Sequence, residues 1–180
     1  MRFAAACLFA LGVLAGCVRS HPGVQPEELR IAARWIEDVA HGIPRRAGEL
    51  DPVQASEEQR RLAAWAIGDD ISGRRVPPRQ LRARLARWPS LSAALRSRLL
   101  LIDRERGLVG PAPTLAPGDF ALAAEIADAE NADRRTIDAI VLARAQASQE
   151  ATGWYADAVR EARVELDAAA GGTPWEPEKR

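Results

Sequence analysis

The chain is poor in the side chains that carry most nucleophilic and metal chemistry. Its 180 residues include two Cys, two His and one Lys. Both cysteines precede residue 18, and Lys179 lies next to the C-terminus. A cysteine nucleophile, a buried Ser-Lys pair and a metal site built from Cys or His therefore lack their residues in the rest of the chain. We expect no metal, no cofactor and no catalytic residue.

Histidine offers little more. His21 comes before the first predicted helix, and His41 lies at the end of that helix. A Ser-His-Asp site would have to use His41. We expect His41 instead to interact with the C-terminal end of its helix, where a positive charge is favourable.

The chain also has no net charge, because 25 Lys and Arg balance 25 Asp and Glu. This balance excludes a globally basic nucleic-acid binder, and we expect no nucleic-acid partner. The charges are unevenly placed, since residues 74–106 carry +8 and residues 119–167 carry −6. The Arg-rich segment 74–106 is suited to contact anionic lipid head groups, at about 1 kcal/mol per Arg. It is equally suited to dock on the acidic segment, to bind an acidic partner or to form a solvated face.

The N-terminus carries a short apolar run. Phe3–Val13 spans eleven residues, fewer than the roughly 20 that cross a bilayer. With Arg2 before it and small residues after it, the run is typical of a secretory signal. Its end, Leu14-Ala15-Gly16-Cys17, resembles the lipobox of bacterial lipoproteins, whose Cys receives lipid. We expect a signal peptide at 1–16 and a lipidated Cys17 with its tether at 17–25; an ordinary secretory signal is the alternative.

The lipobox resemblance implies an N-terminus that is acylated more than once, palmitate included, which anchors a protein stably. The residues from Val18 to Gln25 reach at most about 28 Å, so the folded part stays near the membrane. Val18 stands where enteric lipoproteins retained in the inner membrane have Asp. We therefore expect a lipid-anchored cell-envelope protein that faces the periplasm, on the outer membrane rather than the inner.

Apolar residues at helical spacing predict the fold. A first helix opens at Pro26 and stops at Gly42 and Pro44, and a second runs from the capping box at Ser56 to Gly73. No stretch alternates β-branched and polar residues. The chain is therefore predicted to be an all-α bundle of five or six helices. One face of the first helix holds Leu29, Ala32, Ala33, Ile36, Val39 and Ala40.

Prolines and glycines place the other helix ends. Pro89 is expected to separate a helix over 79–88 from one that Gly107 caps. The last helical block starts at Asp119, bends or breaks near 148–153 and ends at Gly171. The segment 107–118 holds three Gly and three Pro. It is predicted to connect an N-terminal helical region (26–106) to a C-terminal one (119–177).

Four carboxylates lie close together in the C-terminal region: Glu125, Asp128, Glu130 and Asp133. Their spacing of three residues could serve a cation or acid–base work. Glu130 and Arg134, however, are four residues apart in the favourable order for an ion pair. A solvated, salt-bridged helix face is therefore the expected arrangement, and the same holds for Asp69-Asp70.

Five tryptophans stand out in an aromatic-poor chain. Trp35, Trp65, Trp88 and Trp154 fall on or beside apolar helix faces and are predicted to lie in the core. Trp175 follows the last predicted helix. We expect it to fold back onto the bundle, with exposure to a partner as the alternative.

Three short segments of the C-terminal half form a recognisable pattern. They are Arg104-Glu105-Arg106-Gly107-Leu108-Val109-Gly110, Ala129-Glu130-Asn131-Ala132-Asp133-Arg134-Arg135 and Gly172-Thr173-Pro174-Trp175. Together they are similar to the YdbL-like family of small bacterial envelope proteins, whose domain has no established function. Longer members are lipoproteins with added N-terminal helices, as here. The similarity covers about residues 95–177. The chain departs from the family where Pro111, Pro113 and Pro117 replace an acidic, Gly-rich stretch, and where Asp138 replaces an aromatic residue.

The resemblance implies no established catalysis and an accessory, chaperone-like role in an envelope assembly of the lipid-transport type. Asn131 and Arg134 share a helical turn and are suited to hold the Gly107–Gly110 turn through its carbonyls. Binding a partner is the other role open to them. The candidate interaction or structural residues are Gly107, Gly110, Asn131, Asp133, Arg134 and Trp175.

Three functions follow as hypotheses. The first is a non-enzymatic, membrane-anchored domain that binds an envelope protein. The second is a binder of lipid or another apolar ligand between helices, which would need a deep apolar cavity. The third is a carboxylate-dependent cell-wall hydrolase, which would need the four acids to converge in a cleft with an unpaired member.

Overall fold

The computed structural model describes residues 26–43, 79–144 and 149–175. Within these ranges the chain is mostly helical and has a small three-stranded sheet. The predicted signal peptide, the tether and the helix expected over 56–73, with Trp65, lie outside the described residues. In chain order the elements are α1 (Pro26–Ala40), α3 (Arg79–Arg96), β1 (Leu100–Asp103), β2 (Leu108–Pro111), α4 (Pro117–Arg144), α5 (Gln149–Ala169) and β3 (Thr173–Pro174).

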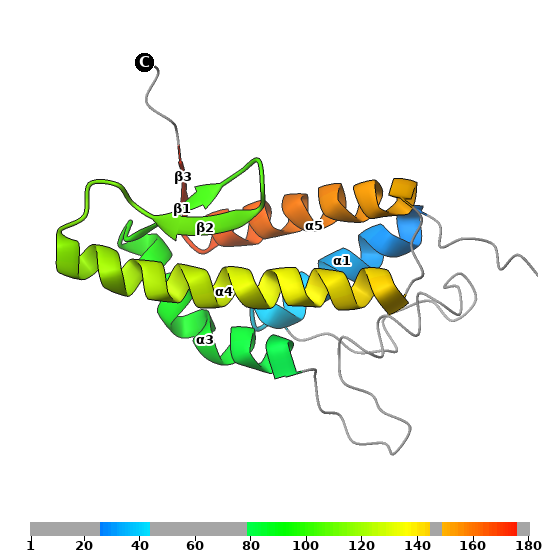
Figure 1. Ribbon diagram of the computed structural model, residues 1–180, viewed down its shortest axis with the longest axis horizontal. Coiled ribbons are helices and arrows are strands. Elements are labelled where there is room, and N and C mark those ends of the chain that lie inside the picture. The colour runs from blue at the N-terminus through cyan, green and yellow to red at the C-terminus, as the bar shows by residue number, and fades with distance from the viewer. Residues whose placement is uncertain (1–25, 44–78, 145–148, 176–180) are drawn as a thin grey trace, which may run out of the picture.

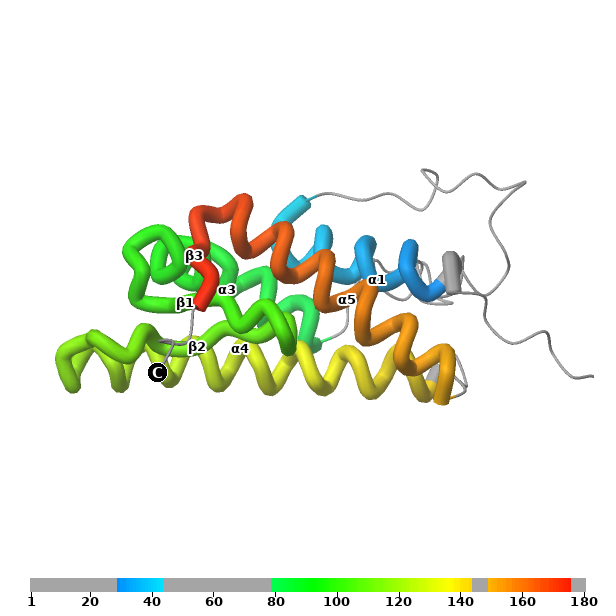
Figure 2. Tube along the Cα trace, turned by 90° about the horizontal axis from the view of Figure 1, so that it is seen from above, coloured from blue at the N-terminus to red at the C-terminus, as the bar shows by residue number. Residues whose placement is uncertain are grey.

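The long helix α4 runs along the described body, and the other elements pack against one another beside it (Figure 1). α1 and α5 lie side by side and point the same way (Figure 2). The sheet lies near the C-terminal end of α5, and the N-terminal ends of α1 and α5 lie at the opposite end (Figures 1 and 2). Among the described residues, no helix combines the length and hydropathy that crossing a membrane requires.

The first helix forms as its sequence predicts. α1 begins at Pro26 and ends at Ala40, and Gly42 follows with a φ of 74°. Such a left-handed angle suits glycine and terminates the helix. Of the six residues predicted to share its apolar face, all except Val39 are buried.

The all-α prediction is wrong at the sheet. Arg98 has a φ of 60°, which ends the preceding helix. The apolar run that follows continues as β1, because a short apolar run fits a buried strand as well as a helix. β1 pairs antiparallel with β2, Leu101 facing Gly110, and parallel with β3, in the order β2-β1-β3. The segment 107–118 thus contains a strand.

The helix break predicted at Pro89 is absent, since α3 passes through this residue. Proline inside a helix costs about 3 kcal/mol. Both halves of α3 are nevertheless held by buried side chains, with Leu81 on one side of the proline and Leu91 and Leu95 on the other. Ser92 Oγ also donates a hydrogen bond to the Pro89 carbonyl at 3.0 Å. Packing on both sides therefore outweighs the cost of the proline.

The described residues build two separate apolar cores. The helical core joins all four helices: Leu29, Ala32, Ala33, Ile36, Ala40, Leu81, Ile137, Val141, Ala151, Tyr155 and Val159. The sheet core joins α3, α4 and the sheet: Leu91, Ala94, Leu95, Leu100, Ile102, Val109, Ala123 and Ala127. Trp35 is buried, while Trp154 packs against the helical core and Trp88 against the sheet core.

Candidate functional site

A layer of buried charged side chains lies between the two cores. On α3, Arg84 falls between Leu81 of the helical core and Leu91 of the sheet core. On α4, Glu130 and Arg134 likewise fall between the segments that supply the two cores. We call this group the ionic layer; its members, all buried, are Glu37, His41, Arg84, Glu130, Arg134, Arg163 and Asp167.

Two arginines bind the carboxylate of Glu37 from opposite helices. Arg84 on α3 donates from Nη1 and Nη2 to Glu37 at 2.9 and 2.7 Å, and from Nε to Glu130 at 2.7 Å. Arg163 on α5 donates to Glu37 at 2.9 Å and reaches Asp138 with its other two nitrogens. Such forked, charge-assisted pairs fix the relative position of their helices. Glu37 therefore ties α1 to both α3 and α5.

Arg134 joins the ionic layer to the sheet. Its Nε donates to Glu130 at 2.9 Å, and its Nη2 donates to Asp167 at 3.0 Å. Its Nη1 donates to the carbonyl of Gly107 at 3.0 Å. One side chain thus links α4, α5 and the turn between β1 and β2.

His41 completes the layer at the end of α1. Its Nδ1 lies 2.6 Å from the Glu37 carbonyl oxygen and its Nε2 lies 3.1 Å from Asp167 Oδ1. Both partners are hydrogen-bond acceptors, so each ring nitrogen that carries a proton can donate to the oxygen that it faces. The ring also packs edge-on against Trp88, with centroids 4.3 Å apart. The expected interaction with the helix end exists, and Asp167 adds a partner that the sequence did not predict.

The arginines set the charge state of the carboxylates. Burial alone would raise the pKa of Glu37, but the charges of Arg163 and Arg84 outweigh it and hold that pKa well below the usual range. Burial opposes ionisation of Glu130 in the same way, yet Arg84 and Arg134 lower its pKa to about 2. Arg134 and His41 likewise lower the pKa of Asp167 despite burial. The carboxylates of the layer are therefore ionised at neutral pH.

The four carboxylates expected on a solvated face differ in their burial. Glu125 and Asp128 are exposed. Glu130 is buried, so the expectation of a solvated side chain is wrong for this residue. It can be buried because it pairs with Arg84, Arg87 and Arg134. Asp133 is partly buried and pairs with Arg87 at 2.8 Å. The predicted Glu130–Arg134 pair is present, but it lies inside the protein.

The Arg-rich segment is partly used inside the fold. Arg84 and Arg87 pair with Glu130 and Asp133 of the acidic segment, as the docking alternative within the chain requires. In the described part of this segment, from residue 79 on, six further arginines are exposed: Arg79, Arg82, Arg96, Arg98, Arg104 and Arg106.

The outer edge of β2 is covered by two side chains of α4. Asn131 Nδ2 donates to the Val109 carbonyl at 2.7 Å, and its Oδ1 accepts from the Val109 amide at 3.2 Å. This amide imitates a neighbouring strand, while Arg134 binds the Gly107 carbonyl one step further along. Pro111 at the end of β2 has no N–H to offer. The edge is therefore closed to strand addition.

The two candidate glycines have different surroundings. Gly107 does not cap a helix; it has a φ of 62° in the β1–β2 turn, and an added Cβ would lie 3.0 Å from the Arg160 Cα. Only glycine fits this position without strain. Gly110 faces Leu101 across the sheet, and an added Cβ would meet nothing within 4 Å. Gly110 thus leaves an open space on the outer face of the sheet.

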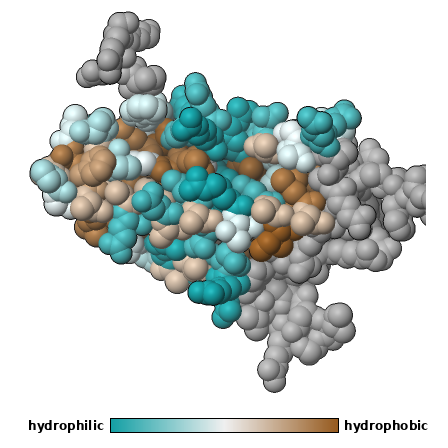
Figure 3. Space-filling model, in the orientation of Figure 1, coloured by the Kyte–Doolittle hydropathy of each residue, from teal (hydrophilic) through white to brown (hydrophobic). Residues whose placement is uncertain are grey.

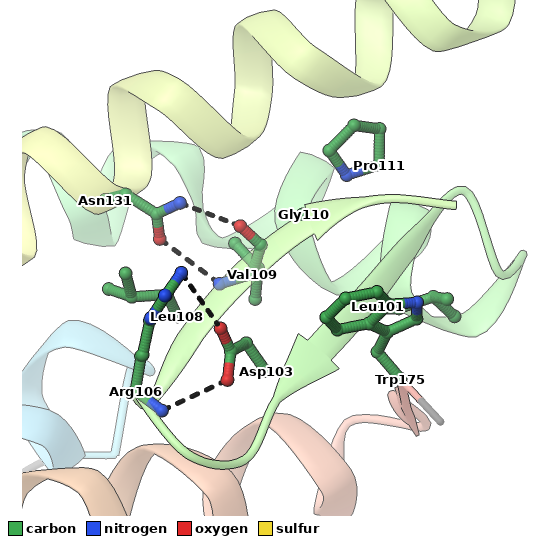
Figure 4. Close-up of a pocket in the computed structure, with 9 residues that line it drawn as sticks. All are labelled: Leu101, Asp103, Arg106, Leu108, Val109, Gly110, Pro111, Asn131 and Trp175. Carbon is green, nitrogen blue, oxygen red and sulfur yellow. Dashed lines mark hydrogen bonds and ion pairs between the residues drawn. The ribbon is translucent and has the colours of Figure 1, made fainter. Parts of the chain in front are cut away.

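A shallow recess of about 300 Å³ lies over this space (Figure 4). Trp175 and Leu101 stand at one end, and Leu108 and Arg106 stand at the other (Figure 4). Trp175 does return to the body, because its amide donates to the Ile102 carbonyl at 2.9 Å, yet its side chain is half exposed. We call this site the sheet recess; its lining residues are Leu101, Asp103, Arg106, Leu108, Val109, Gly110, Pro111, Asn131 and Trp175.

Five of the six candidate residues taken from the family resemblance meet at the sheet. Gly107, Gly110, Asn131 and Arg134 form or hold the β1–β2 hairpin, and Trp175 borders the recess. Asp133 does not join them and pairs with Arg87 instead.

Most members of the ionic layer were not predicted from the sequence. Glu37, Arg84, Arg163 and Asp167 lie among apolar residues at helical spacing; Arg84, for example, is three residues after Leu81. A charged residue on the apolar face of a predicted helix is the signal that would have found them.

Comparison with protein-family models, with curated proteins and with solved structures finds no match for this chain.

Proposed function

We propose that the protein is a membrane-anchored lipoprotein of the bacterial envelope that binds a protein partner and catalyses no reaction. It would be attached through lipid on Cys17 and face the periplasm from the outer membrane. The sheet recess is the observation that carries the proposal. It exposes apolar side chains around the half-exposed Trp175, while the buried polar groups are engaged within the fold.

The state of the carboxylates supports a role in binding over hydrolysis. A general acid near neutral pH needs a raised pKa and access to substrate. Glu130 is buried against three arginines, and its pKa is lowered to about 2. Among the described residues no group of three His, Cys, Asp or Glu side chains is placed to hold a metal ion.

The position of the recess favours a protein partner over a ligand held between helices. The recess lies on the outer face of the sheet and is open to solvent. Its volume of about 300 Å³ is at the lower limit of small-molecule pockets. It accommodates one or two side chains of a partner.

Membership of the YdbL-like family would place the protein in an envelope assembly of the lipid-transport type. The gathering of the hairpin glycines, Asn131, Arg134 and Trp175 around one sheet supports this proposal. In such an assembly the protein would act as an accessory or chaperone-like component.

Metabolic labelling with palmitate tests the anchor. Wild-type protein expressed in a bacterium should incorporate label and fractionate with the outer membrane. Cys17→Ser should abolish both, whereas Cys7→Ser, within the predicted signal peptide, should leave both unchanged. Unlabelled wild-type protein would contradict the anchor.

Crosslinking on intact cells tests the partner. A crosslinker on the lipidated protein should capture a specific envelope protein. A wild-type protein that yields only itself under all crosslinking conditions would contradict the binding role.

A further inference from the structure

We propose that the sheet recess binds an extended segment of an envelope protein, which inserts one aromatic side chain over Gly110 and presents a carboxylate to Arg106. This inference rests on the proposed function for the location of its partner. It defines the chemistry that the recess would recognise.

The shape of the recess favours an aromatic ring. Leu101 and Leu108 point to the outer face of the sheet, and Gly110 between them has no side chain. The space above Gly110 is open, and the Trp175 ring borders it (Figure 4). Aromatic rings pack favourably against one another at centroid separations of about 4.5–7 Å. A ring laid over Gly110 would contact Trp175 on one side and Leu108 on the other.

Both edges of the sheet exclude the common alternative, in which a peptide adds a strand. Asn131 and Arg134 occupy the backbone groups along the outer edge of β2. On the other edge, Trp175 donates its amide inward to Ile102, so the outward-facing residue of β3 is Pro174, which has no N–H. A ligand must therefore bind through its side chains on the face of the sheet.

An exposed arginine at the mouth of the recess can pair with an acidic neighbour of the ring. Arg106 is exposed, and its guanidinium lies 3.9 Å from Asp103, a long and weak surface pair. Asp103 Oδ1 already accepts the backbone amides of Glu105 and Arg106 in the turn. Because its side chain is 77% exposed, the Arg106 guanidinium can donate to a second carboxylate from outside while it keeps its contact with Asp103.

The recess lies at the end of the body away from the predicted tether. The predicted tether ends at Gln25, directly before α1, and α1 begins at the end of the body opposite the sheet (Figures 1 and 2). α1 has 15 residues and is therefore about 22 Å long. The recess therefore lies at the opposite end of the described body from the point where the predicted tether joins the fold (Figures 1 and 2).

A library of random linear peptides, selected on the detergent-solubilised full-length protein, tests the proposal. The recovered peptides should share Phe, Tyr or Trp with Asp or Glu beside it. Gly110→Leu, which fills the recess from within, should weaken their binding at least about tenfold. Gly153→Leu is the matched control, because Gly153 also has open space around it but lies on α5. It should leave binding unchanged.

Two further variants separate the two contacts. Arg106→Glu should weaken the acidic peptides about three- to tenfold and should favour versions in which Lys replaces the acid. Trp175→Ala should weaken the binding of all aromatic peptides. This variant replaces Gly110→Leu in the test if circular dichroism shows that Gly110→Leu does not fold.

Three results of the peptide selection would overturn the proposal. Selection could recover no peptide, the recovered peptides could bind Gly110→Leu and Trp175→Ala as well as wild type, or they could lack an aromatic residue. Binding to vesicles of anionic phospholipid that Gly110→Leu abolishes would assign the recess to a bilayer and would also overturn it. Peptide binding does not depend on lipid at Cys17, so its outcome is separate from that of palmitate labelling.

Discussion

The ionic layer and the sheet recess reverse the usual placement of polar and apolar side chains. In the layer, Arg84, Arg134 and Arg163 are at most 2% exposed, whereas Trp175 at the recess is 50% exposed. The space-filling view shows apolar surface at the end that carries the sheet, and hydrophilic surface over the middle of the body (Figure 3). The buried charges are fully paired, and the exposed tryptophan borders an open space. The layer is thus built to hold the fold, and the recess is available for contact.

The buried charges of the layer can specify how the helices are arranged without adding much to the free energy of unfolding. Removing two charges from water costs several kcal/mol each, and pairing regains about that amount. Most pairs in the layer join different elements, such as Glu37 on α1 with Arg163 on α5. A shift of one helix by a turn would leave these charges buried and unpaired. We infer that the layer fixes the register of the four helices.

The largest expected effect comes from breaking the layer at Arg134. Arg134→Leu removes the partner of Asp167 and of the Gly107 carbonyl, and should lower the free energy of unfolding by about 3–5 kcal/mol. Chemical denaturation measures this change. Arg135→Leu, at the exposed neighbouring position, should change it by less than about 0.5 kcal/mol. Equal effects of the two substitutions would contradict a structural role for the layer.

The second-largest effect is expected from acid, which should reduce the contribution of the ionic layer to stability. The folded-state pKa values of Glu37, Glu130 and Asp167 are lowered, that of Glu130 to about 2. Their contribution is therefore complete above the pKa values of the unfolded chain and is lost as the pH falls. The thermal midpoint should fall between about pH 5 and pH 2. A Glu130→Gln variant should show a shallower fall, and a flat profile for the wild type would argue against ionised carboxylates in the layer.

Substitutions of the two hairpin glycines should change stability less. They compare Gly107, which the turn requires, with Gly110, which lies under the recess. Gly107→Ala places a side chain at a φ of 62° and against the Arg160 backbone, and should cost about 1–3 kcal/mol. Gly110→Ala meets open space and should be close to neutral. Paired thermal melts measure the difference. Similar melting temperatures for the two variants would show that the turn around Gly107 is not under the constraint described.

The smallest effect is expected at the exposed arginines. We propose that those of the Arg-rich segment add an attraction to anionic lipid, worth about 1 kcal/mol per Arg near the surface. Vesicle binding by the full-length protein should then fall with rising salt. Arg79→Glu together with Arg82→Glu should reduce it, whereas Arg87→Gln, at an internally paired position, is the control. Binding that is insensitive to salt would exclude the electrostatic contact.

Local sequence signals predicted α1 well and β1 poorly, for a physical reason. The apolar stripe of α1 extends over several turns and ends at a glycine, so periodicity alone defines it. β1 is four residues long. Leu99 and Ile102 continue the helical spacing of the apolar residues before them, although the positive φ of Arg98 has already ended the helix. That angle depends on packing against the rest of the fold. Three-dimensional context therefore decided where the helix ended.

The candidate site shows the same division. Asn131 and Arg134 could be connected to the Gly107–Gly110 turn because they share a helical turn and the right donors. Glu37 and Arg163 could not be paired, since 126 residues separate them and either side chain alone resembles a solvated one. The recess was not predicted from the sequence, because it forms only where Gly110 on β2 faces Leu101 on β1.

The long separation between Glu37 and Arg163 also orders the events of chain synthesis. α1 emerges first, but Glu37 and His41 find Arg163 and Asp167 only once α5 has been made. A carboxylate buried without its partners is strongly unfavourable. Glu37 can pair with Arg84 once α3 has been made, but its contact with Arg163 and that of His41 with Asp167 wait for α5. The full set of buried pairs is thus complete only when α5 is present.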